Sequence, residues 1–191
     1  SKMTPISICV IMKNEEKHME AFLSSIQRFF KNCPHEIVLV DTGSVDNTLS
    51  IAQKYTDKIF HFKWIDDFSA ARNFSISCAS YDWILVLDCD EYVIKLDPQG
   101  LQEMINRYPG AVGMLSRRNH YEMNGTDSVY TDDVERFFNR KTFHYEAIVH
   151  EQVRTRNGYN FMRFAIPLVV DHYGYTGNPD ELRKKAQRNN E

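Results

Sequence analysis

The first half of the chain alternates short apolar runs with segments whose apolar residues recur at helical spacing. The runs at residues 6–11, 36–40 and 59–62 have the composition of strands that are buried on both faces. Asp46 and Asp67 stand where two of the intervening helices should begin, as N-cap residues do. Alternating strands and helices predict parallel pairing with right-handed crossovers. We therefore expect an α/β fold with a Rossmann-like, doubly wound, mostly parallel sheet and helices on both faces.

A fourth apolar run, at residues 83–87, stops abruptly on Asp88-Cys89-Asp90-Glu91. Ligands of open α/β sheets bind beyond the carboxyl ends of the strands. In an extended backbone Asp88 and Asp90 would point to the same side with Cα atoms roughly 6.5–7 Å apart, close enough to share a hard cation. Acidic residues after a strand also form turns and cap helices. The pattern predicts Mg²⁺ or Mn²⁺ carrying a phosphate.

The pattern changes beyond Gly110, where short strand-like pieces are separated by polar loops. These pieces lie at 112–116, 137–138, 148–149 and 166–170, and residues 179–189 have the pattern of a polar helix. We expect one domain over residues 1–191, with the doubly wound half at 1–110 and a smaller extension at 111–191 on the same sheet. The polar end stops within a helical pattern, which leaves open whether the natural chain continues past residue 191.

Composition narrows the class of protein. The 191 residues include 42% hydrophobic and 26% charged residues with a net charge of −3, which describes a soluble globular domain. Long blocks of basic residues are absent, which argues against a nucleic-acid partner. No apolar segment approaches the roughly 20 residues of a transmembrane helix, and the start lacks a secretory signal pattern. The four cysteines form no Cys-x-x-Cys pair. We expect a cytoplasmic protein with free thiols, and peripheral attachment to the inner face of the membrane stays open.

Several polar motifs follow the predicted strands in a fixed order. They are Lys13-Asn14-Glu15-Glu16, Asp41-Thr42-Gly43-Ser44-Val45-Asp46-Asn47-Thr48, Asp67-Phe68-Ser69-Ala70-Ala71-Arg72-Asn73, Asp88-Cys89-Asp90-Glu91, His150-Glu151-Gln152 and His172-Tyr173-Gly174-Tyr175. Over nearly the whole chain this order resembles the family 2 inverting glycosyltransferases of GT-A fold, in particular bacterial non-processive members. The resemblance implies a nucleotide-sugar-binding half at 1–110 and an acceptor-side half at 111–191.

The resemblance assigns a nucleotide-sugar site at the strand ends. Its implied residues are Glu15, Asp41, Asp67, Arg72, Asp88 and Cys89. A carboxylate accepts hydrogen bonds only, so Asp41 suits a uracil N–H or a ribose hydroxyl, although a turn-forming Asp is the simpler alternative. Arg72, near the start of a helix, would face a diphosphate. Asp67 would contact the donor or only cap that helix.

The same resemblance implies a metal site and a displacement reaction. Asp90 would bind Mn²⁺ or Mg²⁺ directly, and His172 would complete the metal shell. The implied reaction moves a sugar from a nucleotide-sugar donor, with UDP favoured, to an acceptor hydroxyl. Glu151 is our first choice as the general base, and Asp133 in the Asp132-Asp133 pair competes with it. The acceptor is left open between a glycan, a lipid-linked sugar and a protein side chain.

Other functions remain as alternatives. A nucleotidyltransferase of similar fold would usually carry a Gly-rich, basic loop after the first strand, and Lys13-Asn14-Glu15 is not one. A phosphatase with a nucleophilic aspartate would place Asp-x-Asp after the first strand rather than the fourth. A non-catalytic nucleotide-sugar-binding module is the third alternative. The Gln-x-x-Arg-Trp signature of processive synthases is absent, so we expect one sugar or a few to be added.

Overall fold

The computed structural model describes residues 2–147 and 151–174, and the fold of these residues is built on one large mixed sheet. The strands are β1 (Ile6–Met12), β2 (His35–Asp41), β3 (Ile59–His61), β4 (Trp83–Val86), β5 (Glu91–Leu96), β6 (Val112–Met123), β7 (Thr126–Asn139), β8 (Phe143–Glu146), β9 (Gln152–Thr155) and β10 (Arg163–His172). Eight of them form a sheet in the order β3-β2-β1-β4-β7-β6-β10-β5, and β8 pairs with β9 separately. Within the described residues four of the seven pairings in the large sheet are parallel.

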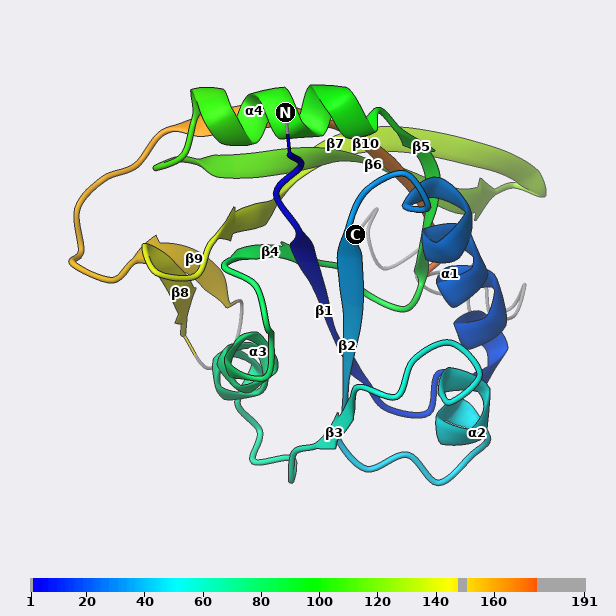
Figure 1. The fold of residues 1–191 in the computed structure, drawn as a ribbon. Helices are drawn as coiled ribbons and strands as arrows, with labels where there is room; N and C mark the ends of the chain where they lie inside the picture. The colour runs from blue at the N-terminus through cyan, green and yellow to red at the C-terminus, as the bar shows by residue number, and fades with distance from the viewer. Residues whose placement is uncertain (1, 148–150, 175–191) are drawn as a thin grey trace.

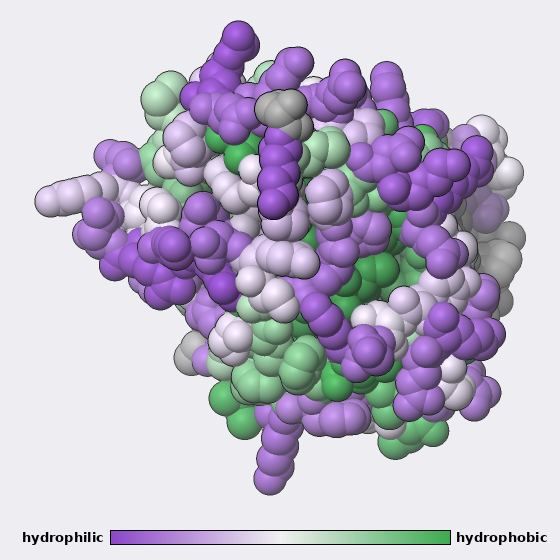
Figure 2. All heavy atoms as spheres, viewed as in Figure 1, coloured by the Kyte–Doolittle hydropathy of each residue, from purple (hydrophilic) through white to green (hydrophobic). Residues whose placement is uncertain are grey.

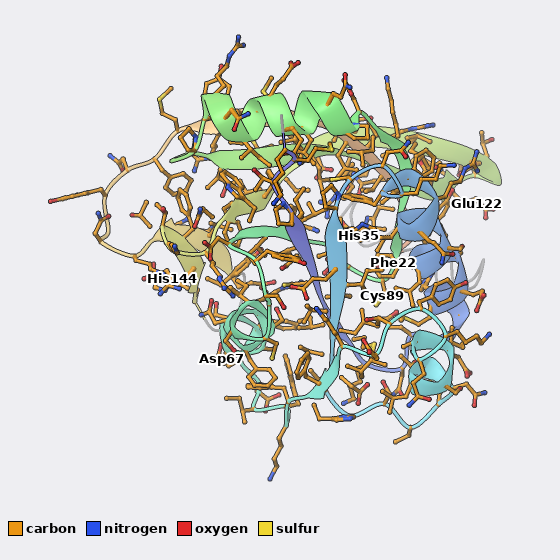
Figure 3. The ribbon with its side chains drawn as sticks, viewed as in Figure 1. Phe22, His35, Asp67, Cys89, Glu122 and His144 are labelled. Carbon is orange, nitrogen blue, oxygen red and sulfur yellow. The ribbon has the colours of Figure 1, made fainter. Side chains whose placement is uncertain are left out.

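Helices cover both faces of this sheet, as the alternating pattern predicts (Figure 1). The helices are α1 (Glu16–Phe29), α2 (Thr48–Ala52), α3 (Phe68–Ser77) and α4 (Pro98–Arg107). The apolar residues of α1, α2 and α4 share the larger hydrophobic core with one face of the sheet. Those of α3, β8 and β9 share a second core with the opposite face. Phe22 of α1 points into the larger core, on the same side as Cys89 (Figure 3).

The predicted elements of the first half are confirmed, with small differences at their ends. Strands were expected at 6–11, 36–40, 59–62 and 83–87, and the structure has β1, β2, β3 and β4 there. The helix expected after Asp46 begins one residue later than predicted, since Asn47 is the N-cap of α2. Asp46 instead accepts hydrogen bonds from the backbone N–H and hydroxyl of Thr48. The acidic side chain therefore supports the entry to this helix without capping it.

The second half departs further from the expectation of short strands. The pieces expected at 112–116 and 137–138 are the inner ends of β6 and β7, which form a long antiparallel hairpin. The strand β5 and the small sheet of β8 and β9 were not predicted. The expected strand at 148–149 and helix at 179–189 lie outside the described residues.

The parallel strands bring their carboxyl ends to one edge of the sheet. Met12 at the end of β1 pairs in register with Asp41 at the end of β2, and β4 lies on the other side of β1. The surface seen in Figure 2 is mostly hydrophilic, with apolar atoms in smaller groups between polar ones. In the described part of the chain, no helix has the length and apolar character needed to span a bilayer. The four cysteines are free thiols.

Candidate active site

A cavity of about 370 Å³ lies at the carboxyl edge of the parallel strands. Its lining comes from the loops after β1, β2, β3 and β4, from the first half of α3 and from the end of β10. The residues that line it are Ile11, Met12, Lys13, Glu15, Thr42, Trp64, Phe68, Arg72, Asp88, Cys89, Asp90 and His172. Six of the predicted site residues are among them, so the topology gathers motifs that are far apart in sequence.

The carboxylate of Asp88 is held by two arginines. Its Oδ1 accepts a hydrogen bond of 2.7 Å from Arg72 Nη2, and its Oδ2 lies 3.5 Å from Arg136 Nη2. Burial alone would raise the pKa of Asp88, but the two guanidinium groups outweigh it and hold that pKa well below its usual range. Arg72 is 7% exposed, and its Nη1 is buried with no hydrogen-bond partner among the described residues. An anionic group in the cavity would satisfy this nitrogen.

The expectation that Asp88 and Asp90 share one cation from an extended backbone is wrong in its geometry. The strand β4 ends at Val86, and the chain then turns so that the N–H of Glu91 donates to the carbonyl of Asp88. This turn replaces the strand alternation on which the shared cation depended. Asp88 therefore faces the arginines, and Asp90 faces a different partner.

Asp90 faces His172, as the proposed metal pair requires. Asp90 Oδ2 lies 3.2 Å from His172 Nε2, and the N–H of Tyr173 donates to the carbonyl of Asp90. A Cβ on Gly174 would lie 2.7 Å from His172 Nε2 and 3.0 Å from Asp90 Oδ2, so only glycine leaves this corner open. In residues 2–147 and 151–174 no group of three or more His, Cys, Asp or Glu is arranged around one point. The pair fits a cation whose other ligands are phosphate oxygens and water.

Glu15 faces the same acidic corner from the loop after β1. Burial is the main reason that its pKa rises to about 7, and the negative charges of Asp90 and Asp88 add to the shift. A cation bound at Asp90 would offset these charges. The loop that carries Glu15 is tied to the start of α2, because the Glu15 N–H donates to the hydroxyl of Thr48.

Asp41 lies at the end of β2 and has one oxygen without a partner. Its Oδ2 accepts hydrogen bonds from the N–H groups of Gly43 and Ser44, at 3.1 and 3.0 Å. Its Oδ1 is buried and accepts no hydrogen bond from the described residues. The predicted ligand-binding role would use this second oxygen, but Asp41 is not among the residues that line the cavity.

Asp67 and Cys89 have structural roles in the described residues. Asp67 is the N-cap of α3 and accepts a hydrogen bond of 3.0 Å from the N–H of Ala70. It does not line the cavity, and in Figure 3 it lies at the start of α3, well apart from Cys89. Cys89 does line the cavity, but the residue is 3% exposed and packs in the larger core. Burial raises the pKa of its thiol well above the ordinary value, so this cysteine stays protonated.

A second cavity, of about 600 Å³, adjoins the first. Arg72 and Asp88 line both cavities and so form their common wall. Both candidate bases, Glu151 and Asp133, line the second cavity. Glu151 directly precedes β9, and its Oε1 lies 3.6 Å from Arg72 Nε. The two carboxylates therefore lie on the opposite side of Arg72 from the proposed cation pair.

The sequence did not point to the buried charges behind these cavities. Arg136 on β7 donates to both oxygens of Glu91, at 2.7 and 3.0 Å, and Glu91 is fully buried. Glu91 also accepts a hydrogen bond of 2.8 Å from the N–H of Asp88. Arg136 directly precedes the predicted strand piece at 137–138, yet its partners come from β5 and the turn after β4. That pairing depends on sheet order, which a local pattern does not reveal.

Comparison with known proteins agrees with this arrangement. The family model described as Glycosyl transferase family 2 matches residues 7–167. The chain belongs to glycosyl transferase family 2. Both the family predicted from the sequence motifs and the glycosyltransferase class are thereby confirmed.

Two relatives of this family 2 glycosyltransferase match 97% of the chain. A TPR repeat-containing protein of Synechococcus elongatus is 31% identical and the SPbeta prophage-derived glycosyltransferase SunS of Bacillus subtilis is 29% identical. The chain spans 46% and 44% of their lengths, so it is less than half as long as either relative.

Solved structures show the same fold. S. aureus TarS 1-349 in complex with UDP is 24% identical with a TM-score of 0.52, over 64% of this chain and 37% of that one. The predicted GT-A fold of this family 2 domain is thereby confirmed.

Proposed function

We propose that this domain is a metal-dependent, inverting glycosyltransferase that moves a sugar from a UDP-sugar to an acceptor hydroxyl. The observation that carries the proposal is the shared wall of the two cavities, where Arg72 and Asp88 separate the Asp90–His172 pair from Glu151 and Asp133. Residues 1–110 would hold the donor and residues 111–191 the acceptor, within one domain. The free thiols favour a cytoplasmic location.

Asp41 supports uridine as the nucleoside. One carboxylate oxygen is used by the turn, so a single buried acceptor remains for the base or ribose. One acceptor matches the single ring N–H of uracil better than the two adjacent donors of guanine. Trp64 and Phe68, whose ring centroids lie 4.9 Å apart, form an apolar wall of the first cavity, which also includes Thr42, the residue after Asp41.

Arg72 and the Asp90–His172 pair support binding of the diphosphate. The buried Nη1 of Arg72 would donate to a phosphate oxygen, while Asp88 keeps the guanidinium oriented. Asp90 and His172 would hold Mn²⁺ or Mg²⁺ together with the diphosphate. A bound divalent cation supplies Lewis-acid stabilisation of the charge that develops on the leaving diphosphate.

Glu151 is the proposed general base for a single displacement. It lies in the second cavity, where an acceptor hydroxyl would approach the sugar from the side opposite the leaving diphosphate. The ion pair with Arg72 Nε holds its carboxylate toward the common wall. A carboxylate in that position can accept the acceptor's proton while the new glycosidic bond forms. Attack from the opposite side inverts the anomeric centre.

Thermal unfolding with nucleotides tests the donor assignment. We expect saturating UDP with Mn²⁺ to raise Tm by about 5–10 °C, because a ligand that binds only the native state stabilises it. GDP should give less stabilisation, and dTDP, which shares the ring N–H, should fall between them or match UDP. Equal stabilisation by UDP and GDP would remove uridine from the proposal. Stabilisation by none of the three would overturn the nucleotide site.

A further inference from the structure

Asn119 lies in the middle of β6 and contacts His172 directly. The two residues face each other in the register of β6 and β10, and His172 Nδ1 lies 2.8 Å from Asn119 Oδ1. Asn119 is 1% exposed. Neither the sequence motifs nor the family assignment points to this residue. Asn119 is therefore a buried polar side chain in direct contact with a proposed cation ligand.

The surroundings of Asn119 fix which way its amide points. Its Nδ2 donates to Asp132 Oδ1 at 2.8 Å and lies within 3.4 Å of the carbonyls of Arg117 and Tyr130. All three partners are acceptors. Turning the amide over would place its oxygen against a carboxylate and two carbonyls, and a buried polar group without a donor is costly. Asn119 Oδ1 therefore faces His172.

This orientation also favours a proton on Nδ1 of the imidazole. An amide oxygen can only accept, so the Nδ1 of His172 must carry the hydrogen of this contact. Nε2 lies 3.2 Å from Asp90 Oδ2, which is also an acceptor and, without a cation, competes for the hydrogen of the neutral ring. A cation between Asp90 and Nε2 would remove this competition, so that Nε2 offers its lone pair to the cation while Nδ1 keeps the hydrogen. A metal-binding histidine usually donates its other N–H to a fixed acceptor in this way.

We propose that Asn119 is a positioning residue that holds His172 in the Nδ1–H tautomer, so that Nε2 and Asp90 together bind the divalent cation. The proposal rests on the cation site of the proposed function and names the residue that prepares it. Asn119 itself touches neither the substrate nor the cation.

An ionised carboxylate keeps the amide in place. Asp132 accepts two hydrogen bonds from Arg117, at 3.0 Å from Nε and 2.7 Å from Nη2. The bond to Arg117 is the main reason that the pKa of Asp132 is lowered, so this carboxylate stays charged and keeps attracting the Asn119 N–H groups. Arg117 Nη1 lies 3.6 Å from the buried Glu91. The chain of contacts thus links the ring of His172 to the buried charges behind Asp88.

The tautomer can be read by ¹⁵N NMR of the imidazole rings in the metal-free Asp90→Ala protein, which lacks the competing carboxylate, with the His172 signals assigned from an Asp90→Ala/His172→Gln variant. At a pH where the ring is neutral, we expect the Nδ1–H form in Asp90→Ala. Adding Asn119→Leu, which has a similar shape but no acceptor, should move the ring toward the Nε2–H form. An Nε2–H ring in Asp90→Ala would overturn the proposal whether or not the domain transfers sugar.

The effect of Asn119 on cation binding can be tested by calorimetric measurement of Mn²⁺ affinity in the presence of UDP. Asn119→Leu should weaken Mn²⁺ binding by about 10- to 100-fold, as the loss of an outer partner of a metal ligand does. In a His172→Ala background the same substitution should change Mn²⁺ affinity less than about two-fold, because its effect passes through His172. An equal loss in both backgrounds would mean a general structural effect and would overturn the proposal.

Two controls complete the test. Thr155→Val removes the hydrogen bond from the buried Thr155 hydroxyl group to the carbonyl of Tyr159, outside both cavities. It should leave Mn²⁺ affinity and the His172 tautomer unchanged. If Asn119→Leu does not fold, the NMR measurement on Asp90→Ala decides the tautomer alone. An Nδ1–H ring in Asp90→Ala together with a wild type that binds no Mn²⁺ would overturn the cation site, and with it the role assigned to Asn119.

Discussion

Three acidic residues line the first cavity, and each has different neighbours. Asp88 is bound by Arg72 and Arg136, and its pKa is held low. Asp90 lies against His172. Glu15 is partly buried near both aspartates, and its pKa is raised to about 7. Carboxylates with opposite shifts side by side are common at functional sites. We therefore expect a substitution at Glu15 to change how stability depends on pH.

Glu15→Gln should change how stability depends on pH. The pKa of Glu15 is raised in the folded state, so the wild type binds a proton there that the unfolded chain has lost, and its stability falls as pH rises from about 4.5 to about 7. Glutamine cannot ionise. We expect the metal-free variant to match the wild type near pH 5 and to exceed it by about 1–2 kcal/mol at pH 8. Urea unfolding at both pH values measures this difference.

The exposed Glu103 on α4 gives a matched control. Glu103→Gln should show no such growth in the difference between pH 5 and pH 8. A Glu15→Gln difference that stays constant over this range would show that Glu15 is not protonated in the folded protein near neutral pH.

Glu151→Gln and Asp133→Asn separate the two candidate bases, which line the same cavity. Removing the base should lower turnover by about 10²- to 10⁴-fold while donor affinity stays within a few-fold of the wild type. We expect this result for Glu151→Gln and a much smaller loss for Asp133→Asn. Steady-state transfer and calorimetric UDP binding are the two measurements. The reverse order of effects would assign the base to Asp133.

The sequence predicted the site residues that stand next to strand ends, because there the chain order alone places them. Glu15 and Asp90 line the first cavity as expected, and so does Arg72 from within α3. The sequence did not predict the roles of Asn119 and Arg136 or the burial of Glu91. Their roles come from register across β6, β7 and β10, between residues that a local pattern cannot connect.

At the scale of elements, the apolar pattern predicted only the buried end of β7. In β7 the buried residues are Phe137 and Phe138, whereas the outer part of the strand is exposed or half-buried. The hydrophobic pattern therefore reported the inner end of a 14-residue strand and missed the rest. The turn at Asn124-Gly125, with both residues at positive φ, is the local signal that would have predicted the hairpin.

Asp67→Ala tests whether this residue serves α3 or the ligand. Asp67 caps α3 and does not line the cavity. We expect a loss of about 1 kcal/mol of stability, a Tm lower by about 2–4 °C and unchanged UDP affinity. Asp97→Ala is the matched control, because Asp97 caps α4 through the N–H of Gly100 in the same way. A UDP affinity lowered about ten-fold by Asp67→Ala, but not by Asp97→Ala, would return Asp67 to the donor site.

At the scale of the whole molecule, one sheet carries both halves of the proposed reaction. The parallel strands β1, β2 and β4 supply the donor-side loops, and the antiparallel pairing of β4 with β7 joins them to the acceptor side. Buried ion pairs reinforce this junction, since Arg136 on β7 holds both Glu91 and Asp88. The breaking of such a pair is costly because it leaves a buried charge without a partner. The geometry of the cation site therefore depends on contacts across the sheet.

UDP affinity with and without Mn²⁺ tests the central claim most directly. Calorimetry should compare the wild type, Asp90→Asn and, as a control, Asp127→Asn on the exposed outer part of the β6–β7 hairpin. We expect Mn²⁺ to tighten UDP binding at least about ten-fold in the wild type and in Asp127→Asn, and less than about two-fold in Asp90→Asn. Equal UDP affinity in Mn²⁺ and in EDTA for the wild type would contradict the claim that Asp90 and His172 hold a cation for the diphosphate.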